Sequence, residues 1–144
     1  MNIKIKKINE NAKIPTRGST SAAGYDLYAC IDEPVTIKPH ETAKIGTGLA
    51  MEIPEGYFGA MFARSGLACK QGLRLANSVG VIDSDYRGEY IVALHNDCDV
   101  ERTVEPHDRI AQLVVMPFLS VEFTEVQELS ETERDTGGFG SSGR

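Results

Sequence analysis

The sequence predicts an all-β fold, either a β-sandwich or a β-barrel, with at most one short helix. Apolar residues recur at every second position in several short runs, as they do in half-buried strands. Glycine and proline, 14 and 6 of the 144 residues, interrupt the chain at short intervals and leave little room for a long helix. The alternating runs are Ile3 and Ile5, Val35 and Ile37, and Tyr90, Val92 and Leu94.

One segment has the features of a helix. Ser65–Gly72 is long enough for one or two turns, in which Leu67 and Ala68 would face inward. Gly72 would end the helix, because glycine adopts the left-handed conformation that commonly follows a helical C-terminus.

The length predicts a single domain, since 144 residues are too few for two ordinary ones. We expect a β-rich core over residues 1–130. Residues 131–144 are expected to form a flexible C-terminal arm of the same domain, because they contain the run GGFGSSG and no strand or helix pattern.

Charge argues against a nucleic-acid partner. Fifteen Lys and Arg stand against twenty-one Asp and Glu, which gives a net charge of −6, and the longest basic run is Lys6 and Lys7. Binding to a duplex relies on clustered cations that release counterions. No apolar stretch approaches the length of a membrane span, so we expect no membrane partner either.

The cysteines predict a reducing compartment. Cys30, Cys69 and Cys98 are an odd number without a Cys-x-x-Cys pair, which argues against a disulfide framework and a zinc ribbon. The N-terminus alternates and lacks the apolar centre of a signal peptide. We therefore expect a cytoplasmic protein.

Residues 80–90, with the sequence GVIDSDYRGEY, read as a β-hairpin with a polar tip. Taken alone, its Asp and Gly residues are explained by turn geometry. The chemical alternative is that Asp83, directly after Val81 and Ile82, is a carboxylate held by an apolar wall and able to take a proton from water. Upstream, Asn77 offers both a donor and an acceptor, which suits the edge of a nucleobase.

Three further segments contain groups that suit phosphate or a metal ion. Arg64, Ser65 and Gly66 combine a guanidinium, a hydroxyl and a bare backbone, although a capping Ser beside a surface Arg explains them too. Asp26 is either a turn residue or a carboxylate directed at a hydrated Mg²⁺. Gln112 is either a neutral contact to an anion or a residue facing solvent.

The C-terminal arm combines a permanent charge with an isolated aromatic ring. Arg134 precedes Phe139, which stands among glycines and serines. The ring could stack on a base while Ser141 and Ser142 contact phosphates, and plain disorder is the alternative.

Taken in order, five segments resemble the five motifs of the trimeric dUTP pyrophosphatases. The match covers nearly the whole chain, with the spacing usual in that family. Its one departure is Ala63, where many members place a proline before the arginine. The segments are GYD at 24–26, RSGL at 64–67, GVIDSDYRGE at 80–89, RIAQL at 109–113 and RDTGGFGSSG at 134–143.

The resemblance implies a jelly-roll-like β fold and a homotrimer with shared active sites, where the arm of one subunit closes over a neighbour's site. It also implies Mg²⁺-dependent hydrolysis of dUTP to dUMP and pyrophosphate. That reaction limits uracil incorporation into DNA and supplies dUMP for thymidylate synthesis.

The resemblance also assigns roles by position. Asp83 activates the attacking water, and Asp26 meets the metal through water. Tyr86 packs under the deoxyribose and crowds out a 2′-hydroxyl. The phosphate contacts are Arg64, Ser65, Gly66, Gln112, Arg134, Ser141 and Ser142. The residues around the base and sugar are Asn77, Gly80, Val81, Ile82, Tyr86, Ile91, Phe139 and Gly140.

Three other functions fit part of the sequence. A dCTP deaminase has a similar fold, but the chain lacks a deaminase-type Glu motif and carries the GGFGSSG arm. A nucleotide sensor that does not hydrolyse dUTP would not need both Asp83 and the arm. A sugar-binding β-sandwich leaves the ordered motifs unexplained. His40, His95 and His107 have no ligand-like spacing, so we expect them at the surface or in packing.

Overall fold

The computed structural model describes residues 1–138, and its secondary structure is nearly all β. The prediction of a distorted, jelly-roll-like all-β fold with at most one short helix is confirmed. In chain order the elements are β1 (Lys4–Lys7), β2 (Tyr25–Tyr28), β3 (Val35–Ile37), β4 (Thr42–Gly46), β5 (Leu49–Glu52), β6 (Tyr57–Phe62), α1 (Ser65–Gln71), β7 (Leu73–Leu75), β8 (Val79–Ile82), β9 (Ile91–Asn96), β10 (Arg102–Val104) and β11 (Arg109–Pro117).

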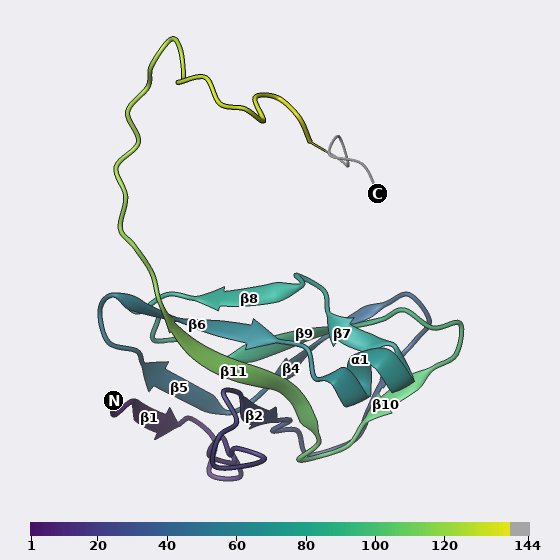
Figure 1. Cartoon of the computed structure of the whole chain (residues 1–144). Helices are drawn as coiled ribbons and strands as arrows, with labels where there is room; N and C mark the ends of the chain where they lie inside the picture. The colour runs from purple at the N-terminus through teal and green to yellow at the C-terminus, as the bar shows by residue number, and fades with distance from the viewer. Residues whose placement is uncertain (139–144) are drawn as a thin grey trace.

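The strands form four small antiparallel sheets (Figure 1). A four-stranded sheet has the order β2-β11-β6-β8, and a three-stranded sheet has the order β4-β9-β7. The pairs β1-β5 and β10-β3 complete the fold. One buried cluster takes side chains from both larger sheets, including Leu27, Met61 and Leu113 from one and Val92 and Leu94 from the other. The two sheets therefore share one hydrophobic core.

The predicted alternation is confirmed in β9 and at Tyr90, the residue before it. Tyr90, Val92 and Leu94 are all buried, while Ile91 between them is exposed. Period-two burial of this kind is what a strand with one face on the core requires.

The predicted hairpin over residues 80–90 is wrong. β8 pairs with β6, where Ile82 lies opposite Gly59, whereas β9 pairs with β4 and β7. Residues 83–90, the crossing segment, therefore pass from the four-stranded sheet to the three-stranded sheet. The apolar pattern on either side of the segment predicts both strands, but it does not say which strand each of them pairs with.

The predicted helix is confirmed as α1, and Gly72 ends it in the left-handed region with a φ of 67°. The Gly72 N–H donates to the Leu67 carbonyl, which satisfies one of the last helical acceptors. A side chain at Gly72 would collide with the sulfur of Cys98. Leu67 packs against the core, as expected, and thereby fixes the helix on the sheet edge.

Residues 118–138 contain no helix or strand and leave the body of the molecule beyond β11 (Figure 1). Phe118 is still attached, because its N–H donates to the Gly56 carbonyl at 3.1 Å. The division into a core and a C-terminal arm at residue 130 stays a prediction, as does the arm's flexibility. Phe139, Gly140, Ser141 and Ser142 lie outside the described residues. Residues 1–138 include no helix with the length and apolar character needed to cross a membrane.

Candidate active site

A pocket of about 230 Å³ opens between β8, the crossing segment and β9. We call it the base pocket. It brings together seven residues predicted from the sequence, namely Asn77, Gly80, Val81, Ile82, Asp83, Tyr86 and Ile91. Five lining residues were not predicted, namely Met61, Leu75, Glu89, Tyr90 and Ala93.

The base pocket stays open because Gly80 has no side chain. A Cβ at this buried position would lie 3.1 Å from the Met61 Cβ and 3.6 Å from the Asn77 Nδ2. Asn77 itself lies in the turn between β7 and β8, exposed and within reach of the pocket. Its amide thus presents a donor and an acceptor beside the space that Gly80 leaves free.

Tyr86 is fixed by contacts within the crossing segment. Its hydroxyl donates to the Glu89 carbonyl at 3.1 Å. The Glu89 carboxylate in turn accepts from the Gly48 N–H at 2.8 Å, which ties the segment to the turn between β4 and β5. The Tyr86 ring is therefore held in place although 44% of the residue is exposed.

Asp83 lies at the rim of the base pocket, at the start of the crossing segment. Its backbone carbonyl accepts from the Tyr86 N–H at 3.2 Å, which turns the chain. The expected apolar enclosure is absent in the single chain, because Asp83 is exposed. An exposed carboxylate at a pocket rim is able to accept a hydrogen bond from water.

A second hollow of about 440 Å³ lies at the other edge of the four-stranded sheet. We call it the phosphate groove. Asp26 on β2 and Gln112 on β11 face each other in register, and Arg64 and Ser65 join from the end of β6 and the start of α1. The predicted turn alternative for Asp26 is wrong, because Asp26 lies within a strand. Gly66 follows Ser65 but does not line the groove.

Charges in the phosphate groove are already paired. The Arg64 Nε donates to one oxygen of Asp26 at 2.7 Å, and a guanidinium nitrogen of Arg109 donates to the other at 3.4 Å. The Asp26 side chain is 13% exposed and the Arg64 side chain 24% exposed. Two guanidinium groups around one carboxylate leave a net positive charge, which favours phosphate oxygens.

Two further residues of the fourth predicted motif act in this groove. Gln112 is not directed at solvent, because its Nε2 donates to the Ala63 carbonyl at 2.9 Å and so holds the backbone before Arg64. Arg109 was not assigned a role from the sequence. Its place at the start of the same RIAQL motif as Gln112 was the available signal.

The base pocket and the phosphate groove share no lining residue. Asp83 follows Ile82, which pairs with Gly59 in the first half of β6, whereas Arg64 lies beyond the end of that strand. Arg64 is five positions after Gly59 along extended chain, a distance of roughly 16 Å. One chain therefore does not bring Asp83 and Arg64 to the same phosphate group.

The donor set of the phosphate groove fits Mg²⁺ only in part. Within residues 1–138, no three His, Cys, Asp or Glu side chains gather in a way that would enclose a metal ion. Among the residues that the structure describes, Asp26 is the one carboxylate that lines the groove. Mg²⁺ keeps most of its waters and is commonly held by one or two carboxylates together with substrate phosphates, so Asp26 suits that arrangement.

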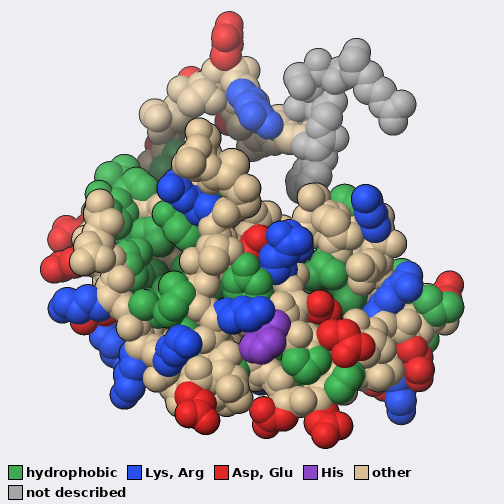
Figure 2. Space-filling view, turned by 90° about the horizontal axis from the view of Figure 1, so that it is seen from below, with side chains coloured by type: hydrophobic (Ala, Val, Ile, Leu, Met, Phe, Trp, Pro, Cys, Tyr) green, Lys and Arg blue, Asp and Glu red, His purple; other side chains and the backbone are tan. Residues whose placement is uncertain are grey.

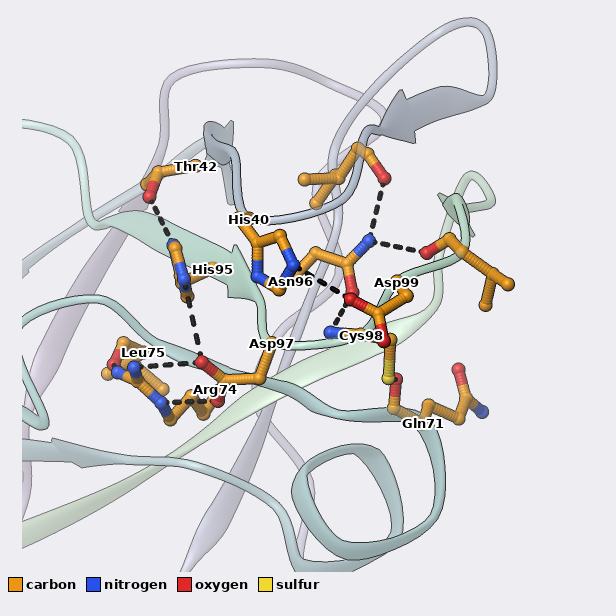
Figure 3. Close-up of polar contacts among 12 residues, drawn as sticks. His40, Thr42, Gln71, Arg74, Leu75, His95, Asn96, Asp97, Cys98 and Asp99 are labelled. Atoms are coloured by element: carbon orange, nitrogen blue, oxygen red, sulfur yellow. Dashed lines mark hydrogen bonds and ion pairs between the residues drawn. The ribbon is translucent and has the colours of Figure 1, made fainter.

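A separate polar cluster accounts for two histidines (Figure 3). His40 Nε2 lies 3.0 Å from an oxygen of Asp99, and His95 Nδ1 lies 2.9 Å from the Thr42 hydroxyl. Arg74 donates two hydrogen bonds to Asp97, at 2.6 and 3.0 Å, and these lower the pKa of the Asp97 carboxyl. These histidines stabilise the loop after β9, in agreement with the packing and surface roles expected for them.

Arg134 is not brought to the groove. Its Nε donates to the Gly137 carbonyl at 2.8 Å, within the same C-terminal segment.

The comparisons with known proteins decide the family. The family model described as dUTPase matches residues 10–143. The chain belongs to the dUTPase family. This confirms the family predicted from the five motifs.

Relatives of the dUTPase family match over most of their length. A deoxyuridine 5′-triphosphate nucleotidohydrolase of Hydrogenobaculum sp. is 48% identical over 143 residues, which is 99% of each chain. A protein of the same name from Desulfitobacterium hafniense is 52% identical over 132 residues, which cover 91% of this chain and 87% of that one.

Solved dUTPase structures share the fold. A mutant dUTPase of Staphylococcus bacteriophage 80alpha, solved with dUpNHpp, aligns with a TM-score of 0.90 and 32% identity over 99% of both chains. A mutant dUTPase from phage phi11 of S. aureus, described with a structural Mg(II) ion, has a TM-score of 0.81 and 28% identity. That alignment covers 91% of this chain and 100% of the phage chain.

Proposed function

We propose that the chain is a dUTP diphosphatase that hydrolyses dUTP to dUMP and pyrophosphate, with Asp83 as the general base. The observation that carries the proposal is the base pocket, where Asn77 lies beside a cavity kept open by Gly80 and Asp83 stands at its rim. The names of the relatives support the same substrate. The reaction keeps uracil out of DNA and supplies dUMP.

In this mechanism Asp83 accepts a proton from water as the water attacks a phosphorus atom. The phosphoanhydride bond between the α and β phosphates breaks, and pyrophosphate leaves. A positioned general base supplies about 10² to 10⁴ in rate, so orientation and charge must supply the rest.

Specificity for a deoxyuridine nucleotide follows from the pocket walls. Asn77 and the backbone of β8 read the pattern of donors and acceptors on the uracil edge. Cytosine would leave some of these groups unpaired, and such mismatches cost up to about 10⁴ to 10⁵ in discrimination. Tyr86 packs under the deoxyribose, and Ile91 with Val81 borders the base.

The phosphate groove binds the triphosphate. Arg64 and Ser65 would contact phosphate oxygens, with Gln112 beside them, and Asp26 would hold hydrated Mg²⁺ through its water. When bound, Mg²⁺ neutralises phosphate charge and orients the triphosphate for attack. The structural Mg(II) ion named for the phage phi11 protein supports a role for this metal in the family.

We extend the proposal to a homotrimer with shared active sites. Each chain carries a base pocket and a phosphate groove that are too far apart to serve one phosphate group. If the groove of one subunit faces the base pocket of a neighbour, both halves meet on one nucleotide. In a closed ring of three such contacts, every base pocket faces the phosphate groove of a neighbouring subunit.

Exposed apolar surface supports the same assembly. Leu119, Val121 and Phe123 alternate along the C-terminal segment and are 88%, 61% and 95% exposed. This strand-like pattern was overlooked in the sequence. Single chains rarely leave such a stripe uncovered.

The body of the chain offers a matching groove of about 400 Å³ beside β1. Figure 2 shows hydrophobic side chains gathered on the left of the viewed face, the side where β1 and the N-terminus lie in Figure 1. The lining is mainly apolar and includes Ile3, Ile5, Ile14, Met51 and Val115. Within residues 1–138, β1 pairs only with β5, so its other edge can accept the segment of a neighbour. If the C-terminal segment of each subunit binds beside β1 of its neighbour, the arm residues after 130 would lie over a neighbouring site.

Mixing two inactive variants tests the shared site. Asp83→Asn keeps an intact groove, and Arg64→Ala keeps an intact base pocket. In randomly reassembled 1:1 trimers, roughly a quarter of the shared sites regain both halves. We expect hydrolysis to return to about that share of the wild-type rate. No recovery in verified mixed trimers would contradict shared sites.

Product analysis tests the reaction itself. The wild-type protein is incubated with each deoxynucleoside triphosphate, with and without Mg²⁺. We expect dUMP and pyrophosphate from dUTP alone, whereas ammonia released from dCTP would indicate a deaminase. We place the protein in the cytoplasm, a proposal supported by the three free thiols of Cys30, Cys69 and Cys98.

A further inference from the structure

Tyr90 lines the base pocket but has no role in the proposed chemistry. It is 1% exposed, and its backbone is fixed by the turn between β4 and β5. The Tyr90 N–H donates to the Leu49 carbonyl at 2.9 Å, and the Tyr90 carbonyl accepts from the Thr47 hydroxyl at 2.7 Å. The Tyr90 side chain is therefore buried and attached to a fixed stretch of backbone, whereas the Tyr86 side chain is exposed.

The Tyr90 ring lies against the Tyr86 ring. Their centroids are 6.3 Å apart and the planes are inclined by 31°. The other contacts that locate the Tyr86 ring come from the crossing segment itself. The Glu89 carbonyl accepts from its hydroxyl, and Gly88 leaves room for it, since a Cβ there would collide with the Tyr86 hydroxyl.

The ring of Tyr90, and not its hydroxyl, makes this contact. The hydroxyl is buried and forms no hydrogen bond with any residue in the described part of the chain. Burial raises the pKa of Tyr90 to about 12, so the side chain is neutral at physiological pH. A phenylalanine at this position would present the same ring to Tyr86.

We propose that Tyr90 is a positioning residue for sugar selectivity, whose ring holds the Tyr86 ring where it excludes a 2′-hydroxyl. The inference rests on the proposed role of Tyr86 beneath the deoxyribose. Excluding a single oxygen atom requires a side chain that does not move away from it. The half-exposed Tyr86 ring is held more rigidly when it packs against the buried Tyr90 ring. An aliphatic residue at position 90 would let the Tyr86 ring move aside and admit UTP.

Three variants separate the ring from the hydroxyl and from simple loss of folding. Tyr90→Phe keeps the ring, whereas Tyr90→Leu removes it. Tyr90→Met is a second ring-free variant, because a flexible side chain fills irregular space if Leu leaves the protein unfolded. Each variant is checked for folding by circular dichroism, and kcat/KM is measured for dUTP, UTP and dTTP.

We expect the ring-free variants to lower the dUTP-to-UTP ratio of kcat/KM by roughly 2- to 10-fold, the range of an aromatic pair contact. The dUTP-to-dTTP ratio should stay unchanged, because the base is bordered by other residues. Tyr90→Phe should keep both ratios. A general structural defect would lower activity on all three substrates and leave the ratios alone.

Each contrary result has a distinct meaning. An unchanged dUTP-to-UTP ratio in a folded ring-free variant would overturn the inference, as would an equal loss in Tyr90→Phe. If Tyr86→Ala also leaves that ratio unchanged, the assignment of Tyr86 fails. If the wild-type protein does not hydrolyse dUTP, the proposed function fails.

Discussion

The base pocket and the phosphate groove are built in opposite ways. The base pocket is shaped by backbone and core, with the bare Gly80, the buried Ile82 and the buried Tyr90 around its floor. The phosphate groove is shaped by charges, with Asp26 bound to two arginines. The base pocket therefore has its shape before a ligand binds. In the phosphate groove, the ion pairs of Asp26 would have to rearrange before the arginines could bind phosphate.

This difference separates recognition from chemistry. In the proposed mechanism, the preorganised pocket selects the base and the sugar, because a wrong nucleoside clashes with the pocket walls or leaves polar groups unpaired. The charged groove would carry little information about the nucleoside, but it would hold and orient the triphosphate. Substitutions in the pocket should therefore change selectivity, and substitutions in the groove should change the requirement for metal and the strength of phosphate binding.

The largest effect is expected from Asp83→Asn, which removes the proposed base. Turnover should fall by about 10² to 10⁴, because general base catalysis supplies that much. Binding of dUpNHpp, measured by calorimetry, should remain within a few-fold of wild type. Asp85→Asn is the matched control, since Asp85 is a nearby exposed carboxylate outside the base pocket. Near-normal turnover in Asp83→Asn would reject the assignment.

Deletion of residues 134–144 should come next. The folded core should remain, because the last strand ends at Pro117. Hydrolysis should fall by about 100-fold if the arm closes the site and orients the triphosphate. Pyrophosphate release measures hydrolysis, and circular dichroism on the same preparation measures whether the core is folded. Full activity in the shortened protein would show that the arm has no part in catalysis.

Asp26→Asn should have an intermediate effect, seen in the Mg²⁺ requirement. The Mg²⁺ concentration for half-maximal activity should rise by roughly 10-fold, a typical cost of losing a group that orients a metal site. Titration of activity with Mg²⁺ measures the change. Asp32→Asn, an exposed carboxylate outside the groove, is the control. Equal Mg²⁺ requirements in both variants would remove Asp26 from the metal site.

Tyr90→Phe should have the smallest effect at neutral pH and a clear one in alkali. The pKa of Tyr90 is raised to about 12 in the folded state, above its ordinary value of 10.0. The unfolded chain therefore loses this proton first, so the stability linked to it is present below pH 10 and declines toward pH 12. The free energy of unfolding should fall by about 3 kcal/mol over these two pKa units. Urea unfolding across that range should show less loss in Tyr90→Phe than in wild type, and equal loss would contradict it.

The sequence predicted the features that depend on residues close together in the chain. Alternation placed Tyr90, Val92 and Leu94 on a buried strand face, and the glycine at 72 placed the end of the helix. The hairpin at 80–90 failed because pairing partners are distant in the chain. A local pattern gives the exposed and buried faces of a strand without naming its neighbour.

The site divides in the same way. Residue types within each motif indicated their chemistry, and Asp83, Asn77 and Tyr86 do meet in one pocket. The pairing of Asp26 with Arg64 spans 38 positions, and nothing local in either segment shows it. The alternation predicts Tyr90 only as a residue of a half-buried strand, because its contact with the Tyr86 ring depends on how the crossing segment folds back.

The paired charges around Asp26 have a consequence for a cell in which other nucleoside triphosphates are abundant. With Asp26 held between Arg64 and Arg109, the empty groove attracts passing polyanions less strongly than two bare guanidinium groups would. ATP or GTP would have to displace these ion pairs without the gain that a fitting base provides. We therefore expect ATP and GTP to be weak competitive inhibitors of the proposed reaction.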